Sequence, residues 1–319
     1  MNLDIISLGE ILAEIMRKDL DVPHNVPGLY VGPYLGGAPA IFIDAAAKFG
    51  AKAGFITVVG DDEFGGLALS RLRNDKVDTS HVRVARGYTT GTSFVMYYSS
   101  GERKFIFHLR HSAAGRLSER DVEEEYVSSC SFLHVMGSSL AISVSSRKAC
   151  YKAVNIAKDS GATVTFDPNL RPELLDVNII RKICKPVLEV CDVVLPSRGE
   201  AKALTGIDDP VKAGERLLEM GPRIAAIKMG DKGAIIVTNE EKIFEPAFEV
   251  SEVDPTGAGD VYDAAFVYGL FRGWNLTRTS EFASAAGAIK VTKFGPMSVP
   301  DSVKEVEDFI QKVPKKRSV

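Results

Sequence analysis

The chain has 319 residues, of which 45% are hydrophobic and 25% charged, and its formal net charge at pH 7 is −3. This length suits one large α/β domain or two smaller ones with a sizeable core. The scattered lysines and arginines exclude the basic face typical of nucleic-acid-binding proteins, and no apolar run of about 18 residues is present to span a membrane.

Short apolar segments alternate with helix-like stretches along most of the chain. Residues 144–160 and 199–205 have the pattern of helices, and Gly206 marks the end of the second. This alternation predicts βαβ units, and therefore an α/β fold with a doubly wound, mostly parallel sheet and helices on both faces. The apolar segments that predict strands are residues 53–59, 132–136, 163–167, 193–195 and 224–229.

Two regions interrupt this alternation and predict a second, smaller sheet. Residues 92–99 and 104–109 are rich in β-branched and aromatic side chains and form a hairpin, joined by strands at 11–16 and 30–34. We expect residues 10–35 and 88–110 to form a lid over the carboxyl ends of the main strands. A solvent-facing decoration is the alternative. The large domain then comprises residues 1–9, 36–87 and 111–319.

The lid, the cysteines and the N-terminus bear on assembly and location. A small edge-rich sheet is marginal alone, so we expect a homodimer formed through the lids. The N-terminus lacks the pattern of a signal peptide, which favours a cytoplasmic protein. The cysteines lack metal-like spacing and lie in mostly apolar segments, as buried thiols of a reducing compartment do. They are Cys130, Cys150, Cys184 and Cys191.

The sequence DPTGAGD at residues 254–260 precedes a helix-like stretch and is the most informative motif. Small residues before a helix leave backbone N–H groups pointing at one spot, which binds an anion. Asp260 then projects beside that anion and is placed to accept a proton, as phosphoryl transfer requires. The alternative is that Asp260 only caps the helix.

Rival phosphate-binding motifs are missing from the chain. There is no GxxxxGK[ST] sequence and no GxGxxG after a predicted strand, so a P-loop enzyme and a dinucleotide-dependent dehydrogenase both lack support. The five histidines show no HExxH or other metal-ligand spacing.

Several motifs together resemble those of the ribokinase-like (PfkB) carbohydrate kinases, in order and over nearly the whole chain. Residues 254–267 resemble the second family signature, and GGAPA at 36–40 resembles the first. DPNLR at 167–171 is similar to a segment of fructokinases and 2-keto-3-deoxygluconate kinases, and KMGDKGA at 228–234 is similar to their nucleotide-binding turn. The sequence of residues 36–44 is most similar to that of the tagatose-kinase-like branch.

This resemblance implies an ATP- and Mg²⁺-dependent kinase that phosphorylates a hydroxyl of a small sugar, with a ketohexose such as tagatose or fructose favoured. Asp260 is the expected base, and the amides of Gly257, Ala258 and Gly259 hold the developing charge. Glu200 is expected to hold Mg²⁺ through water, and Asp254 to lie near K⁺. Residues expected on the sugar are Glu14, Gly36, Gly37, Arg110 and Arg171, and those expected on the nucleotide are Ser197, Glu200, Lys228, Gly230 and Gly233.

The chain also departs from the family pattern in ways that leave the substrate open. Ile41 stands where the family has an asparagine near the sugar, Glu14 is longer than the usual aspartate, and Ser197 replaces the asparagine of the NxxE motif. Arg110 suits a carboxylate, a group of hydroxyls or a salt bridge within the lid. A 2-keto-3-deoxygluconate, inositol or nucleoside kinase and a non-catalytic sensor remain alternatives, although a sensor needs no base at Asp260.

Overall fold

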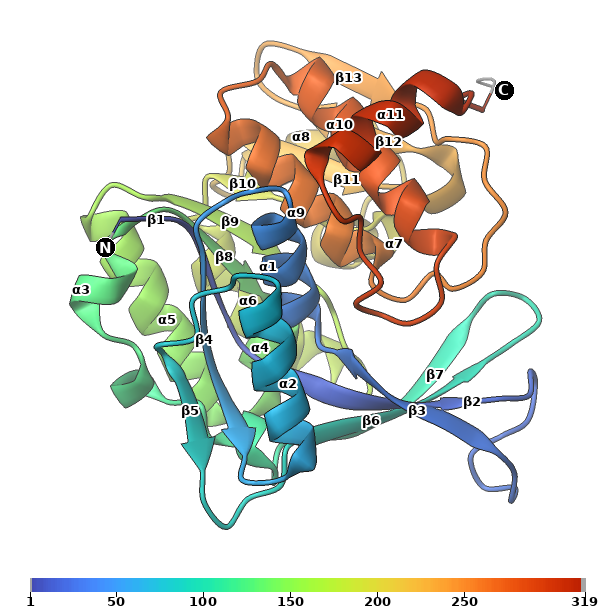
Figure 1. Cartoon of the computed structure of the whole chain (residues 1–319). Helices are drawn as coiled ribbons and strands as arrows, with labels where there is room; N and C mark the ends of the chain where they lie inside the picture. Colours follow the sequence, from blue (N-terminus) through green and yellow to red (C-terminus); the bar gives the residue numbers. More distant parts are fainter. Residues whose placement is uncertain (1, 317–319) are drawn as a thin grey trace.

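The computed structural model describes residues 2–316, so residue 1 and residues 317–319 of the expected large domain lie outside the described part. A nine-stranded sheet forms the centre of the molecule, and a four-stranded sheet projects from one end of it (Figure 1). Helices cover both faces of the large sheet, which confirms the expected α/β fold class.

The large sheet has the strand order β13-β12-β11-β10-β9-β8-β1-β4-β5. Neighbours from β11 to β5 pair in parallel, and β12 and β13 extend one edge as an antiparallel hairpin. Except for the edge strand β5, the parallel strands are largely buried and rich in aliphatic residues, as expected for a sheet covered by helices. The strands are β1 (Leu3–Leu8), β4 (Ala53–Gly60), β5 (Val82–Ala85), β8 (Cys130–Met136), β9 (Thr163–Asp167), β10 (Val193–Val194), β11 (Ile224–Lys228), β12 (Ala234–Val237) and β13 (Lys242–Glu245).

Two hydrophobic clusters hold the helices to the sheet. One contains the buried sides of α1, α9 and α10, and the other contains those of α4 to α8. Burial of such apolar surface is the main favourable contribution to folding. The helices are α1 (Ala38–Lys48), α2 (Glu63–Asn74), α3 (Glu124–Val127), α4 (Gly137–Ile142), α5 (Val144–Asp159), α6 (Val177–Leu188), α7 (Arg198–Thr205), α8 (Pro210–Leu218), α9 (Ala258–Phe271), α10 (Leu276–Val291) and α11 (Val303–Lys312).

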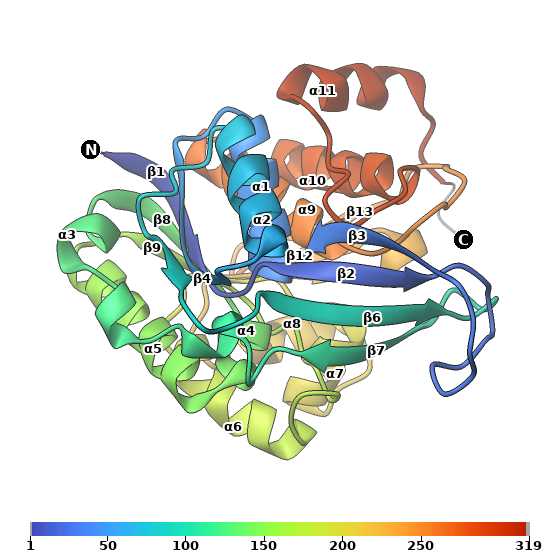
Figure 2. The ribbon, with the colours of Figure 1, turned by 60° about the horizontal axis from the view of Figure 1, so that its bottom comes forward.

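The smaller sheet, called the lid below, has the order β3-β2-β6-β7 and extends away from the helices (Figure 2). Its strands are β2 (Leu12–Arg17), β3 (Tyr30–Gly36), β6 (Gly91–Tyr97) and β7 (Arg103–His108). The β6–β7 hairpin is antiparallel, as the sequence predicted, whereas the central pair β2–β6 is parallel. The second sheet is therefore confirmed, while its movement and its role in dimerisation stay predictions.

The remaining expectations concern thiols and membranes. All four cysteines are free and buried, and burial raises the pKa of Cys130 to about 12. Within residues 2–316, no helix combines the length and the apolar character that crossing a bilayer requires.

Candidate active site

A cavity of about 560 Å³ opens between the lid and the carboxyl ends of the parallel strands. Ligands of open α/β sheets bind at this edge because the loops that follow the strands converge there. Glu10 follows β1, Asp167 ends β9, and Lys228 ends β11, and all three side chains line the cavity. On the lid, β2 contributes Glu14 to the same wall.

The turn before α9 forms one wall of the cavity, as its sequence predicted. Gly257 is the N-cap of the helix and has φ of 88°, in the left-handed region that favours glycine. A Cβ at this position would lie 2.6 Å from the carbonyl oxygen of Pro296, so space as well as φ requires glycine. The amide of Ala258 is 3.3 Å from the carbonyl oxygen of Pro255. The turn thus directs the N-terminal end of α9 at the cavity.

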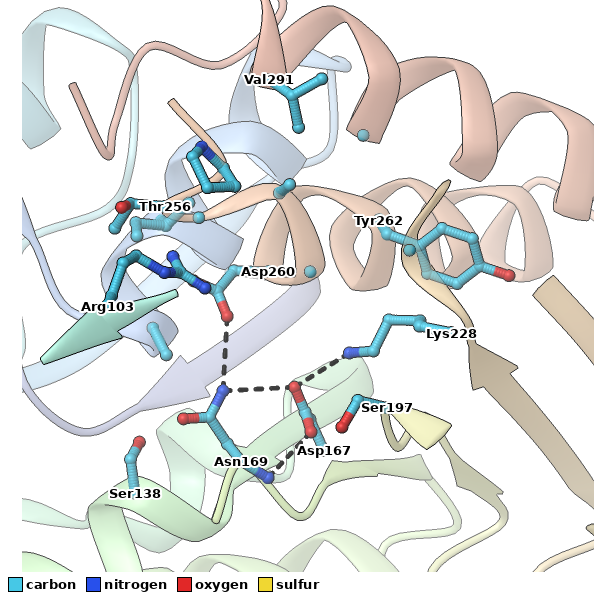
Figure 3. Close-up of a pocket in the computed structure, with 18 of the residues that line it drawn as sticks. Arg103, Ser138, Asp167, Asn169, Ser197, Lys228, Thr256, Asp260, Tyr262 and Val291 are labelled. Atoms are coloured by element: carbon cyan, nitrogen blue, oxygen red, sulfur yellow. Dashed lines mark hydrogen bonds and ion pairs between the residues drawn. The ribbon is translucent and has the colours of Figure 1, made fainter. Parts of the chain in front are cut away.

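Asp260 lies in the first turn of α9, is only 6% exposed, and lines the cavity. Burial raises its pKa to about 7, helped by the charge of Asp167 and opposed by Arg171. Its Oδ1 lies 3.5 Å from Nδ2 of Asn169. Figure 3 shows Asp260, Asn169, Asp167 and Lys228 in a connected row. A carboxylate with a pKa near neutrality is well matched to general-base catalysis.

Lys228 reaches the turn from the opposite wall. Its Nζ donates to both carboxylate oxygens of Asp263 at 2.8 Å and to Oδ2 of Asp167 at 3.1 Å. Although burial lowers the pKa of this amine, the two carboxylates raise it overall, so Lys228 stays charged. A Cβ on Gly259 would lie 3.6 Å from Nζ of Lys228, so the absence of a side chain at this position leaves the ammonium beside the turn.

Two buried glutamates lie on the lid side of the cavity. Oε1 of Glu14 accepts a hydrogen bond from Oγ of Ser93 at 3.1 Å, and its Oε2 has no partner within residues 2–316. Burial raises the pKa of Glu14 to about 7. Glu10 accepts hydrogen bonds from Ser138 and Ser139, each at 2.7 Å, and burial raises its pKa as well. Glu10 was not among the expected sugar contacts, although it directly follows the first strand.

The arginines on the lid side differ in whether they line the cavity. Arg103 and Arg171 line the cavity, each with Cζ 6.0 Å from the ring centroid of Phe105 (Figure 3 shows Arg103). Neither forms an ion pair with a residue in the range 2–316. Arg110 is exposed outside the cavity wall, and its Nε is 3.4 Å from the carbonyl oxygen of Ile142. Arg110 lies beyond the end of β7, whose alternate residues from Arg103 onward face the cavity, so its expected substrate contact finds no support in this arrangement and stays a prediction.

Glu200 lines the cavity and accepts hydrogen bonds from nearby backbone amides. Its Oε2 accepts from the amide and hydroxyl of Ser197 at 2.7 and 2.8 Å, which completes a capping box at the start of α7. Its Oε1 accepts from the amide of Leu170 at 2.8 Å. Burial raises the pKa of Glu200, with a further contribution from Asp167. Ser197 and Glu200 both line the cavity, although their observed hydrogen bonds are to protein groups.

The expected glycines lie around the cavity in two groups. Gly230 and Gly233 line the wall next to Lys228, opposite α10. Gly37 also lines the cavity, with φ of 102°, and a Cβ there would lie 2.6 Å from the carbonyl oxygen of Glu10. Gly36 is not part of the wall, but a Cβ there would lie 3.5 Å from Cδ of Glu14. A side chain at Gly36 would therefore contact Glu14, and the expected sugar contact of Gly36 itself stays a prediction.

Metal binding was expected at Glu200 and Asp254. Among residues 2–316, no three His, Cys, Asp or Glu side chains converge as direct metal ligands. Mg²⁺ in kinases keeps several waters and binds phosphate oxygens, and the carboxylates of Asp167 and Glu200 in the wall fit such an ion. Asp254 is 1% exposed, and its oxygens accept from the amides of Thr256 and Gly295, each at 2.9 Å.

The site and the fold together are those of a carbohydrate kinase. The pattern of the pfkB family of carbohydrate kinases matches residues 2–302, and the chain belongs to this family. The 2-dehydro-3-deoxygluconokinase of Thermoproteus tenax is 34% identical over 313 residues, covering 97% of this chain and 94% of that protein. The 5-dehydro-2-deoxygluconokinase of Geobacillus thermodenitrificans is 29% identical over 318 residues, covering 98% and 94%.

A solved structure of the same fold is also closely similar. An E. coli protein provisionally named ribokinase II, in complex with ATP and Mg²⁺, has a TM-score of 0.90 to this chain at 39% identity, covering 97% of this chain and 99% of that one. These similarities confirm the family that the motifs indicated and show that the protein is a sugar kinase.

Proposed function

We propose that the protein transfers the γ-phosphate of ATP to a hydroxyl of a dehydro-deoxy sugar acid. The observation that carries this proposal is the pair of guanidinium groups of Arg103 and Arg171 on the lid side of the cavity, without a carboxylate partner in residues 2–316. A guanidinium that lines a ligand cavity without a direct ion pair keeps its donors available to a ligand, and its planar donors match a carboxylate.

The two curated relatives support the same class of substrate. Both are named for dehydro-deoxy derivatives of gluconate, which carry a carboxylate. Tagatose and fructose, the sugars favoured from the sequence, are neutral and offer neither guanidinium a carboxylate to bind. Glu10, Glu14 and Asn169 suit the hydroxyls of either class, so these residues do not distinguish the two.

We assign ATP to the side of the cavity away from the lid. Gly230, Gly233 and the small residues Gly287 and Ala288 of α10 line the cavity there. Phe248 and Val250 add apolar surface to it, which suits a planar base. The phosphates then point to the turn before α9, and Mg²⁺ is held through its waters by Glu200 and neutralises phosphate charge.

Asp260 then removes the proton from the attacking hydroxyl. A bond forms between that oxygen and the γ-phosphorus while the bond from this phosphorus to the β–γ bridging oxygen of ATP breaks, ADP leaves, and the proton goes to the carboxylate of Asp260. The N-terminal turn of α9 and the ammonium of Lys228 stabilise the charge that develops on the transferred group. Ile41 adds an apolar wall beside this turn.

A substrate panel tests the proposal. ADP release and product mass are measured with 2-dehydro-3-deoxygluconate, 5-dehydro-2-deoxygluconate, tagatose, fructose, ribose, inositol and a nucleoside. We expect the highest kcat/KM with one of the two acids. A higher value with a ketohexose would overturn the choice of substrate class, and ATP binding without turnover on any compound would favour a sensor.

A further inference from the structure

Lys290, in the last turn of α10, is buried with no exposed surface. Its Nζ donates to the carbonyl oxygen of Asp254 at 2.9 Å and to that of Lys293 at 3.1 Å. Oδ2 of Asp254 lies 3.8 Å away. A fully buried lysine is rare unless its ammonium is paired, so these oxygens explain why it is tolerated there.

The oxygens around this ammonium are of the kind that bind a monovalent cation. They are the backbone carbonyls of Asp254 and Lys293 and the carboxylate of Asp254. Asp254 is the residue near which K⁺ was expected. A lysine ammonium carries the same single positive charge and only donates to oxygens. A second cation on the same carbonyls would lie beside the ammonium and be repelled by it. The residues present therefore do not fit a bound K⁺.

Lys290 also lies where it affects the turn at the active site. The amide of Asp254 donates to the carbonyl oxygen of Val291 at 3.1 Å, and Oδ1 of Asp254 accepts from the amide of Thr256 at 2.9 Å. Oδ2 of Asp254 accepts from the amide of Gly295, in the loop that follows α10. These bonds fix the segment immediately before Gly257 against the end of α10, with Lys290 at their centre.

We propose that Lys290 is a positioning residue that takes the place of a monovalent cation, so that the kinase needs no added K⁺. Its ammonium neutralises the carbonyls and carboxylate beside the turn before α9 and keeps that turn in the arrangement that receives phosphate. The kinetic part of this proposal rests on the proposed function, whereas its effect on thermal stability does not.

The first test uses the unchanged protein with K⁺ replaced by tetramethylammonium at equal ionic strength, with kcat and the melting temperature measured in both salts. We expect kcat to change by less than about 2-fold, because the internal ammonium occupies the site. A K⁺-dependent rise in kcat of about 10-fold, or a melting temperature that rises specifically with K⁺, would overturn the proposal.

The second test uses Lys290→Ala, which opens space for a cation, and Lys290→Met, which keeps the stem and fills that space. In tetramethylammonium, we expect both variants to lose kcat by about 10- to 100-fold, the range for a lost hydrogen bond to a charged group. K⁺ restores kcat and raises the melting temperature of Lys290→Ala but not of Lys290→Met. A role in packing alone predicts no response to K⁺ in either variant, and that result would refute the proposal.

Lys304→Met is the matched control. The Lys304 ammonium forms an exposed ion pair with Asp308 at 2.7 Å within α11, so its loss removes one lysine without touching the Asp254 segment. We expect parental kcat in both salts. If no sugar in the panel is phosphorylated, the melting measurements still decide the matter. If Lys290→Ala does not fold, the salt exchange on the unchanged protein decides it.

Discussion

The two sides of the cavity are built from different materials. On the α9 side, the wall is mainly backbone, with Gly257, Ala258 and Gly259 leaving the turn bare. On the lid side, it is made of long side chains, among them Glu14 and Arg103, that reach in from β2 and β7. A wall of backbone amides suits the phosphate of ATP, which all kinases of this type bind. A wall of side chains can change by substitution, so it suits the part of the site that determines substrate specificity. Chemistry and specificity are thus separable by mutation.

The largest expected effect is on the α9 side. Asp260→Asn is expected to lower kcat by about 10²- to 10⁴-fold, because the amide still caps the helix but does not accept the hydroxyl proton. Single-turnover and steady-state rates measure this. The control is Asp208→Asn, an exposed carboxylate outside the cavity, for which near-parental kcat is expected. A folded Asp260→Asn protein with parental kcat would reduce Asp260 to a cap.

On the lid side, the effect is expected on KM. Arg103→Ala is expected to raise the KM for the sugar acid by about 10- to 100-fold, the range for a lost charged hydrogen bond, with the KM for ATP unchanged. Arg110→Ala is the matched control, because Arg110 is an arginine of the same region that lies outside the cavity. Equal effects of the two changes, or a rise in the KM for ATP, would remove the distinction between the two sides.

The pH dependence joins the two sides. Asp260 acts as a base only when deprotonated, and burial raises its pKa to about 7. We therefore expect kcat/KM to fall about tenfold per pH unit as the pH drops below about 7, and to level off above it. The pKa of Glu14 is also raised to about 7, so the apparent midpoint belongs to both groups. Glu14→Gln separates the two titrations, because in this variant only the fall in kcat/KM that is due to Asp260 should remain.

Glu14→Gln should also have a smaller effect of its own. The amide is close in size and still accepts from Ser93, so we expect the KM for the sugar to rise by about 10-fold at most, with the KM for ATP unchanged. Initial rates at pH 8, where the parental carboxyl is charged, measure this. A rise in the KM for ATP instead would move Glu14 to the nucleotide.

The smallest expected effect is on stability. Because the pKa of Asp260 is raised from 3.8 to about 7, the folded state keeps this proton after the unfolded state has lost it. The resulting stability is complete below about pH 4 and is lost as the pH rises through about 7. Asn carries no such charge, so we expect Asp260→Asn to melt about 3 °C above the parent at pH 8. At pH 4 the variant and the parent should melt at the same temperature. If the variant and the parent differ in melting temperature by the same amount at both pH values, the raised pKa of Asp260 is contradicted.

The sequence predicted the backbone side of the cavity better than the side-chain side. A glycine that must adopt a left-handed φ, such as Gly257, is a local signal, and the residues around it follow directly in the chain. Whether Arg103 or Arg110 lines the cavity depends on where β7 ends and on which residues of the strand face inward. A shift of one residue in the pairing register exchanges the two faces of a strand. Lys290 gave no signal, because the Asp254 carbonyl that it binds lies 36 residues away in the sequence. Its burial depends on tertiary packing alone.

The central pair of the lid has a consequence for how the protein folds. Leu12 of β2 pairs with Gly91 of β6 in parallel, so the intervening chain, with α1, β4, α2 and β5, must return to the same edge before the pair can form. Closing so large a loop costs chain entropy before any contact compensates it. The β2–β3 and β6–β7 pairs each join strands that are close in the sequence, so we expect both to form before the β2–β6 pair that unites them. We therefore expect the lid side of the cavity, with Glu14 on β2, to be completed late during folding.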